Sequence, residues 1–386
     1  MSIILSSFPG ECNRFFWRRG KNTFRAVVPD FAAVVPPSPG CGNAPFHPAE
    51  YPRWTKVLPG VTLEFQGIGK DVDLLPLALR RPLPPITAAI APPSAVMLYL
   101  DDFCGALCQP LVRAGQRVRR GEPVGTSSCG AQVHASVSGV VRAVGSSALV
   151  IENDGRDTPD RRIAPLACLE DVPREPLLQR LPQLGLLTYD LSPLPQKLQP
   201  CHALALAVLS DADFCLFQVF ARQIFGGIRA LATLLRPRRL LLYYDPKRAP
   251  AAETARLLKF PGELQTVDGR CPQLAQRLAG RSLERGVTLG DLGLLVFSPQ
   301  GAAALWDAIY LGEPYLRMGV VIAGEKRRTR TVCTVPLGTS VAHILAQAHL
   351  SAPTVLLGSQ ETGRILRDPT TPLNKGDTLL TCLGGV

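Results

Sequence analysis

Three short, largely apolar runs in the middle of the chain constrain its fold most strongly. They occupy residues 203–209, 239–245 and 292–297, and segments with helical periodicity follow them at 220–235, 251–259 and 302–310. Short continuous apolar runs are typical of strands that are buried on both faces. Their alternation with helices predicts a parallel sheet in a Rossmann-like α/β domain.

Polar residues follow the first and third of these runs, where such a sheet would bind a ligand. Asp211 and Asp213 come after the first run, and Ser298 and Gly301 come after the third. In open parallel sheets, ligands bind outside the carboxyl ends of the strands. We therefore take these four residues as candidates for the remnant of a cofactor-binding site.

A glycine-spaced segment at residues 111–144 predicts a second kind of structure. Short apolar stretches alternate with glycines suited to tight turns, and paired strands are expected at 132–135 and 139–144. This pattern resembles the barrel-sandwich hybrid of lipoyl and biotinyl domains. The expected turns at 127–130 and 136–138 contain no lysine, so the barrel is expected to be unmodified.

The last part of the chain returns to β-structure. A hairpin is expected at 319–325 and 331–339, a helix at 340–349, and further strands at 355–359 and 376–380. This order predicts a small β-grasp domain of the soluble-ligand-binding (SLBB) type.

The chain length requires several domains, because 386 residues exceed what one hydrophobic core usually fills. We expect an α/β multidomain protein with four parts. The proline- and glycine-rich residues 1–61 are expected to be an irregular arm, 62–166 the barrel-sandwich hybrid, 167–316 the Rossmann-like domain, and 317–386 the β-grasp with a final strand.

The eleven cysteines are scattered and odd in number, which favours reduced thiols in a cytoplasmic protein. The alternative is a metal site, for which Cys104, Cys108, Cys129 and His134 are the candidates. The sequence contains no Cys-x-x-Cys-x-x-Cys run, so no iron–sulfur cluster is expected. It also contains no apolar stretch long enough for a membrane helix and no secretory signal pattern.

The net charge of +11 comes from 42 basic and 31 acidic residues, and the basic residues are clustered. No nucleic-acid-binding motif accompanies the clusters, so no nucleic acid is expected as a partner. Docking to acidic protein surfaces or an anionic membrane is the functional interpretation, and a merely solvated surface is the alternative. The candidate docking residues are Arg117, Arg119 and Arg120 on the barrel, and Lys326, Arg327, Arg328 and Arg330 on the β-grasp.

The order of these parts resembles the RnfC family, the C subunits of the Rnf ion-translocating electron-transport complex, which are relatives of the flavin-binding subunit of respiratory complex I. The resemblance covers about residues 62–386. It is carried by the motifs at 133–139, 226–231, 273–281 and 335–339. It implies a peripheral subunit of an NADH- or ferredoxin-linked complex on the inner face of the cell membrane, with the other subunits as partners.

The sequence departs from this family at the places where cofactors would bind. The family's glycine-rich loop is replaced by residues 184–193, in which only Gly185 remains, and the ferredoxin-type cluster motifs are absent. The resemblance therefore implies a docking or scaffold subunit without cofactors, which is not catalytic by itself. The alternatives are an active oxidoreductase subunit that binds FMN or NADH, and a small-ligand-binding SLBB protein.

Overall fold

The structure is a computed structural model, and it describes two groups of residues. In the N-terminal part it describes 3–4, 14–19 and 22–27. Farther along it describes 85–384, except 102–106, 161–173, 196, 199, 247–254, 257–258, 268–279, 281–286, 325–329 and 362. The chain divides into two compact units, Met1–Arg81 and Pro82–Val386.

The first unit contains regular structure within the predicted irregular arm. Strands β1 (Ile3–Ile4), β2 (Arg14–Arg19) and β3 (Asn22–Val27) form an antiparallel sheet in that order. The three consecutive aromatic residues of β2, Phe15, Phe16 and Trp17, have high strand propensity, and the proline-rich composition farther along obscures this signal. The division between the units also falls later than the predicted boundary at residue 61.

The barrel of the second unit consists of two small antiparallel sheets. One has the order β5 (Ala95–Tyr99), β11 (Ala148–Asn153), β10 (Gly139–Val144) and β7 (Arg117–Val118). The other has the order β6 (Cys108–Pro110), β8 (Pro123–Ser127) and β9 (Gln132–His134). The inward side chains of Val96, Val124, Val141 and Ile151 are fully buried between them, as the glycine-spaced pattern predicts.

The predicted parallel sheet is confirmed. Its order is β14 (Glu263–Thr266), β13 (Arg239–Tyr244), β12 (Ala203–Val208) and β15 (Leu294–Phe297), and all neighbours run parallel. Every residue of β12 is buried. Its leucines pack with the helices, whereas its alanines belong to a second cluster on the other face.

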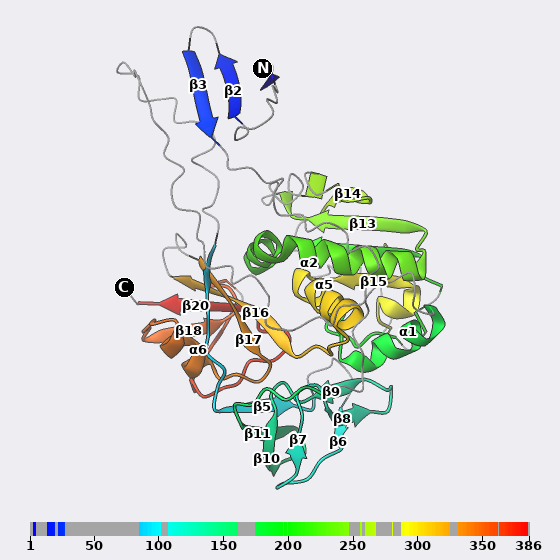
Figure 1. Ribbon diagram of the computed structural model, residues 1–386, viewed down its shortest axis with the longest axis vertical. Helices are drawn as coiled ribbons and strands as arrows, with labels where there is room; N and C mark the ends of the chain where they lie inside the picture. Colours follow the sequence, from blue (N-terminus) through cyan, green and yellow to red (C-terminus); the bar gives the residue numbers. More distant parts are fainter. Residues whose placement is uncertain are drawn as a thin grey trace, which may run out of the picture. The chain divides into compact units, whose positions relative to one another are not determined.

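Two helices cover the leucine face of this sheet. Helix α2 (Asp211–Leu235) follows β12 and α5 (Pro299–Trp306) follows β15, and they lie side by side (Figure 1). A π-helical turn, Asp307–Leu311, continues α5. The short helix α1 (Arg174–Arg180) precedes the sheet, and a 3-10 turn at Leu181–Leu184 follows it.

Two glycines of α2 allow this close approach. A Cβ on Gly226 would collide with the indole ring of Trp306, and a Cβ on Gly227 would collide with the backbone of α5 at the Ala302 carbonyl oxygen. Because glycine has no side chain, the two helices can pack almost backbone to backbone.

The C-terminal part is a six-stranded mixed sheet. Its order is β19 (Arg364–Ile365), β18 (Thr354–Leu357), β20 (Leu379–Leu383), β16 (Arg317–Gly324), β17 (Arg330–Pro336) and β4 (Ile86–Ala88). Helix α6 (Val341–Gln347) follows β17. The hairpin, the helix and the two later strands occur in the predicted order, while the β-grasp assignment itself stays a prediction.

Strand β4 shows that an early segment of the second unit joins the C-terminal sheet. It lies within the segment assigned to the barrel, yet it pairs in parallel with β17, with Ile86 opposite Thr331. The predicted boundaries inside the second unit therefore stay predictions. None of the helices that the structure describes is long and apolar enough to cross a membrane.

Candidate functional site

The carboxyl edge of the parallel sheet is the first candidate site. The chain passes from β12 to β13 and β14 on one side and then crosses to β15 on the other. The direction of strand succession therefore reverses between β12 and β15, which is the usual ligand position in such sheets. The residues that follow these two strands include Asp213, Ser298 and Gly301, so three of the four predicted residues lie at one edge.

At this edge, Asp213 and Ser298 act as helix caps. The Asp213 carboxylate accepts hydrogen bonds from the backbone N–H groups of Leu209 (3.2 Å) and Ser210 (2.9 Å), and the Asp213 N–H donates to Ser210 Oγ (3.0 Å). This is a capping box at the start of α2. Ser298 Oγ accepts from the N–H of Gly301 at 3.1 Å at the start of α5.

The Asp213 carboxyl group is also buried, with 8% of its surface exposed. Burial raises the pKa of this carboxyl group, and the hydrogen bonds that it accepts from backbone N–H groups oppose the shift. The carboxyl group therefore occupies the positive end of α2, where a phosphate would otherwise be attracted.

The chain itself lines the rest of the edge. The Tyr189 N–H donates to the Val296 carbonyl at 2.7 Å, so residues 187–189 run beside β15. The Leu187 carbonyl oxygen lies 3.1 Å from where a Cβ on Gly301 would be. Burial and the charge of Asp213 raise the pKa of Tyr189. These described residues do not fit the phosphate of a flavin or nucleotide.

Asp211, the fourth predicted residue, faces the C-terminal sheet instead. Its Oδ2 atom pairs with Arg330 Nη2 at 2.8 Å, and Arg330 Nη1 donates to Cys215 Sγ at 3.4 Å. Burial raises the pKa of the Cys215 thiol, and the Arg330 charge opposes this shift. A cavity of about 30 Å³ lies beside the pair, between Asp211, Arg330 and Ser359. It has room for one or two water-sized molecules.

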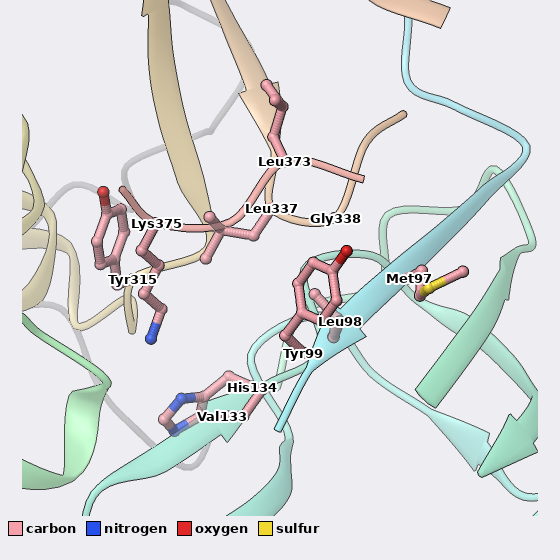
Figure 2. A pocket seen from close by; sticks show the side chains of 10 residues that line it. All are labelled: Met97, Leu98, Tyr99, Val133, His134, Tyr315, Leu337, Gly338, Leu373 and Lys375. Carbon is pink, nitrogen blue, oxygen red and sulfur yellow. The ribbon is translucent and has the colours of Figure 1, made fainter. Parts of the chain in front are cut away.

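A second cavity marks the junction of the barrel with the other two parts of this unit (Figure 2). It measures about 10 Å³, which is room for at most one water molecule. The residues around it come from β5, β9, the segment before β16, the loop between β17 and α6, and the segment between β19 and β20 (Figure 2). The lining residues are Met97, Leu98, Tyr99, Val133, His134, Tyr315, Leu337, Gly338, Leu373 and Lys375.

Hydrogen bonds between the barrel and the C-terminal sheet close this junction. The Met97 N–H donates to the Gly338 carbonyl at 3.0 Å, and Ser136 Oγ donates to the Leu337 carbonyl at 2.6 Å. Each bond joins the barrel to the loop after β17. The Ser136 bond is buried, and a hydrogen bond shielded from water is electrostatically stronger, so it helps to fix the orientation of the barrel against the C-terminal sheet.

Lys375 is the buried basic side chain at this junction, with 5% of its surface exposed. Its Nζ donates to the Gly185 carbonyl at 2.8 Å and lies 5.4 Å from the centre of the Tyr315 ring. Gly185 has a φ of 71°, and a Cβ there would lie 2.8 Å from the Gln132 carbonyl oxygen and 3.6 Å from His134 Nδ1. Gly185, the one glycine at the position of the family's phosphate loop, therefore allows a close approach of the backbone to the barrel.

Three of the four predicted metal ligands lie among the residues that the structure describes. Cys108 is buried and its thiol points to the Ala131 carbonyl, and the exposed Cys129 contacts Ser127 Oγ. His134 faces Gly185 at the junction. No group of three or more His, Cys, Asp or Glu residues suited to a metal occurs among the described residues, and Cys104 lies outside them.

The predicted docking residues fall into three groups. Arg117 and Arg119 are exposed on the barrel. Arg120 and Arg330 are held in ion pairs, Arg120 with Glu313 (2.7 Å) and Arg330 with Asp211 (2.8 Å). The remaining three, Lys326, Arg327 and Arg328, lie outside the described residues.

Sequence patterns do not indicate the junction residues Gly185, His134 and Lys375 as a group. They are far apart in the chain, and each sits in an ordinary local context. The one usable signal is the single glycine inside the apolar run 184–187, because such a glycine often marks a close backbone approach.

The fold and junction define a class of protein: a barrel-sandwich hybrid joined to a parallel α/β sheet and a mixed C-terminal sheet. Residues 84–157 match the family model described as the RnfC barrel sandwich hybrid domain. The chain is 30% identical to the C subunit of the ion-translocating oxidoreductase complex of Pseudomonas aeruginosa over 319 residues, which is 72% of this chain and 40% of that protein. The corresponding protein of Klebsiella pneumoniae is 27% identical, over 73% of this chain and 42% of the relative.

The chain is therefore an RnfC-like α/β multidomain protein, and it spans about two fifths of the length of these curated relatives. Among solved structures, it is similar to a chain of an NAD⁺-reducing [NiFe]-hydrogenase in the air-oxidized state, with a TM-score of 0.39 and 15% identity. That match covers 55% of this chain and 49% of the other.

Proposed function

We propose that the chain is a docking subunit of an ion-translocating electron-transport complex and that it carries no cofactor of its own. Its similarity to RnfC proteins supports the assignment to such a complex. The proposal that the chain carries no cofactor rests on the carboxyl edge of the parallel sheet, where the buried Asp213 side chain occupies the positive end of α2.

The barrel supports docking because it offers exposed cations on a fixed scaffold. Arg117 lies in β7 and Arg119 directly after it, on a barrel whose orientation is set by the junction bonds at Ser136 and Met97. A rigid surface loses little conformational entropy when it binds. In this proposal the partners are the other subunits of the complex, and an anionic membrane surface on the cytoplasmic side lies close to the same face.

Absorbance of the purified full-length protein tests the cofactor half of the proposal. We expect no flavin absorbance, and an intact mass equal to that of the unmodified sequence, because the barrel turns offer no lysine. A stoichiometric flavin spectrum would make the chain an active flavin-binding subunit and overturn this half.

Binding to native membranes tests the docking half. Exposed charges are screened as the Debye length falls from about 10 Å at 0.1 M salt to about 3 Å at 1 M, so we expect the protein to leave the membranes over this range. The double variant Arg117→Glu, Arg119→Glu should bind less well, whereas Arg256→Glu with Arg367→Glu, which reverses two exposed arginines outside the barrel, should not. If neither high salt nor the barrel variant reduces the amount of protein bound to the membranes, docking through these residues is contradicted.

A further inference from the structure

Helix α2 carries a row of arginines on its solvent side that the proposed docking residues do not include. Arg222 and Arg229 lie seven residues apart on α2, Arg236 follows seven residues later as the residue that caps the end of the helix, and all three are exposed. Seven residues make almost two helical turns, so Arg222 and Arg229 lie on one face of α2, and Arg236, whose backbone is left-handed (φ 50°), adds a charge at the C-terminal end of the helix. We call these three residues the arginine stripe.

The arginines of this stripe make no ion pair within the part of the chain that the structure describes. The acidic residues of α2, Asp211 and Asp213, are confined to its first turn. Beyond the end of the helix, Arg238 is exposed and adds a fourth positive charge. The stripe therefore has no acidic residue beside it on the same helix.

Two aromatic rings lie next to the stripe. Trp306 covers Gly226, which sits between Arg222 and Arg229 on the same side of α2, and its ring centre is 4.1 Å from that of Tyr310. Both rings are partly exposed. Tryptophan, tyrosine and arginine are the side chains most enriched among energetically dominant interface residues, so this combination suits a protein partner.

We propose that the arginine stripe binds an acidic helix of a partner protein. The spacing argues for a helix, because arginines seven residues apart repeat about every 10 Å along the axis, and carboxylates seven residues apart on a second helix repeat at the same distance. The planar guanidinium group forms two parallel hydrogen bonds to one carboxylate. A lipid surface has no fixed spacing of its anions and would not favour this arrangement over any other cluster of equal charge.

This inference goes beyond the proposed function, because it concerns α2 and not the barrel. Peptide binding by the purified chain does not depend on whether the chain carries a flavin or joins a membrane complex. The two ideas can therefore fail separately.

The test uses two synthetic helical peptides of identical composition. One places its glutamates at successive heptad positions on one face, and the other spreads the same glutamates around the helix. We measure binding of each labelled peptide to the full-length protein by fluorescence anisotropy at low salt. The heptad peptide should bind more tightly than its isomer.

The decisive variant is Arg222→Glu with Arg229→Glu, which reverses two charges of the stripe. Exposed ion pairs are individually weak, so the loss of two pairs and their replacement by repulsion should weaken binding of the heptad peptide about tenfold or more. The matched control is Arg256→Glu with Arg367→Glu, which makes the same change in net charge at exposed sites outside the stripe and should leave binding unchanged. Circular dichroism checks that both variants are folded.

Three outcomes would overturn the proposal. Equal binding of the two peptides would show that only net charge matters, and an equal loss in the control variant would show the same. If vesicles of phosphatidylglycerol and phosphatidylcholine respond to the stripe variant while the peptides do not, the occupant is a lipid surface and not a helix.

Discussion

Replacement of Gly227 by alanine should destabilise the protein, although alanine is the better helix former. Helix propensity alone predicts a gain of about 1 kcal/mol. In the structure, however, the new Cβ would lie 2.9 Å from the Trp306 backbone nitrogen and would collide with the Ala302 carbonyl oxygen. Neither atom can move without shifting α5.

The magnitude follows from this geometry. Carbon and oxygen atoms normally approach to about 3.3 Å, so α2 and α5 must separate by several tenths of an ångström or more. Overpacking of this kind costs about 1–3 kcal/mol, and a gap of about 0.5–1 Å forfeits a quarter to a half of each dispersion contact along the interface. A backbone obstacle puts the cost near the upper end, so the net loss for Gly227→Ala is about 2 kcal/mol.

The neighbouring glycine supplies a matched control. Gly226→Ala gains the same propensity, but its Cβ meets only the indole ring of Trp306, which is partly exposed and can rotate outward. We expect that variant to stay within about 1 kcal/mol of the wild type and to shift its tryptophan fluorescence. Urea unfolding followed by far-UV circular dichroism measures both variants. The packing argument is refuted if Gly227→Ala is as stable as Gly226→Ala.

Three further predictions address the junctions and a buried thiol. Gly185→Ala should lower the unfolding midpoint by an amount equivalent to more than about 1 kcal/mol. The φ of Gly185 is positive, and the new Cβ would lie 2.8 Å from the Gln132 carbonyl oxygen. A double-mutant cycle of Asp211→Asn and Arg330→Met should give a coupling energy of about 1 kcal/mol that shrinks in high salt. Burial raises the pKa of the Cys333 thiol from 9.0 to about 11. The native state then keeps a proton that the unfolded chain loses, so stability should fall as pH rises from about 9 to 11, and less so in Cys333→Ala.

Each of these predictions has an outcome that would contradict it. An unchanged midpoint for Gly185→Ala would mean that the junction tolerates a side chain there. Additive effects of the Asp211 and Arg330 substitutions would remove the ion pair as a source of stability. A Cys333→Ala variant that loses as much stability between about pH 9 and 11 as the wild type would place the titrating group elsewhere.

Local and strong signals made some elements predictable. The run 203–209 has no polar interruption, and β12 is buried throughout, as such a run requires. The predicted helix at 220–235 begins later than α2, which starts at Asp211, because Ser210 and Asp213 also suit the polar end of a strand and a cofactor edge. They form a capping box instead, and the spacing of Ser and Asp three residues apart is the local signal that indicates it.

Contacts between segments that are distant in the chain could not be predicted from the sequence patterns. The pairing of β4 with β17 depends on three residues, Ile86 to Ala88, that carry no periodicity of their own. Likewise, nothing local indicates that Lys375 donates to Gly185 or that Asp211 turns toward Arg330. Tertiary packing decides these interactions, and a single sequence shows only the residue types that take part.

Strand β4 also affects how this chain can be made and divided. Its hydrogen-bonding partner β17 is synthesised much later. During translation, Ile86–Ala88 therefore stays unpaired while the barrel and the parallel sheet are synthesised. Long-range pairing of this kind is slow to form and leaves apolar surface exposed in the meantime. In a fragment that ends before Arg330, β4 would have no strand to pair with. An isolated C-terminal fragment would lack β4, the edge strand next to β17. The sheet is therefore completed only by the full length of the second unit.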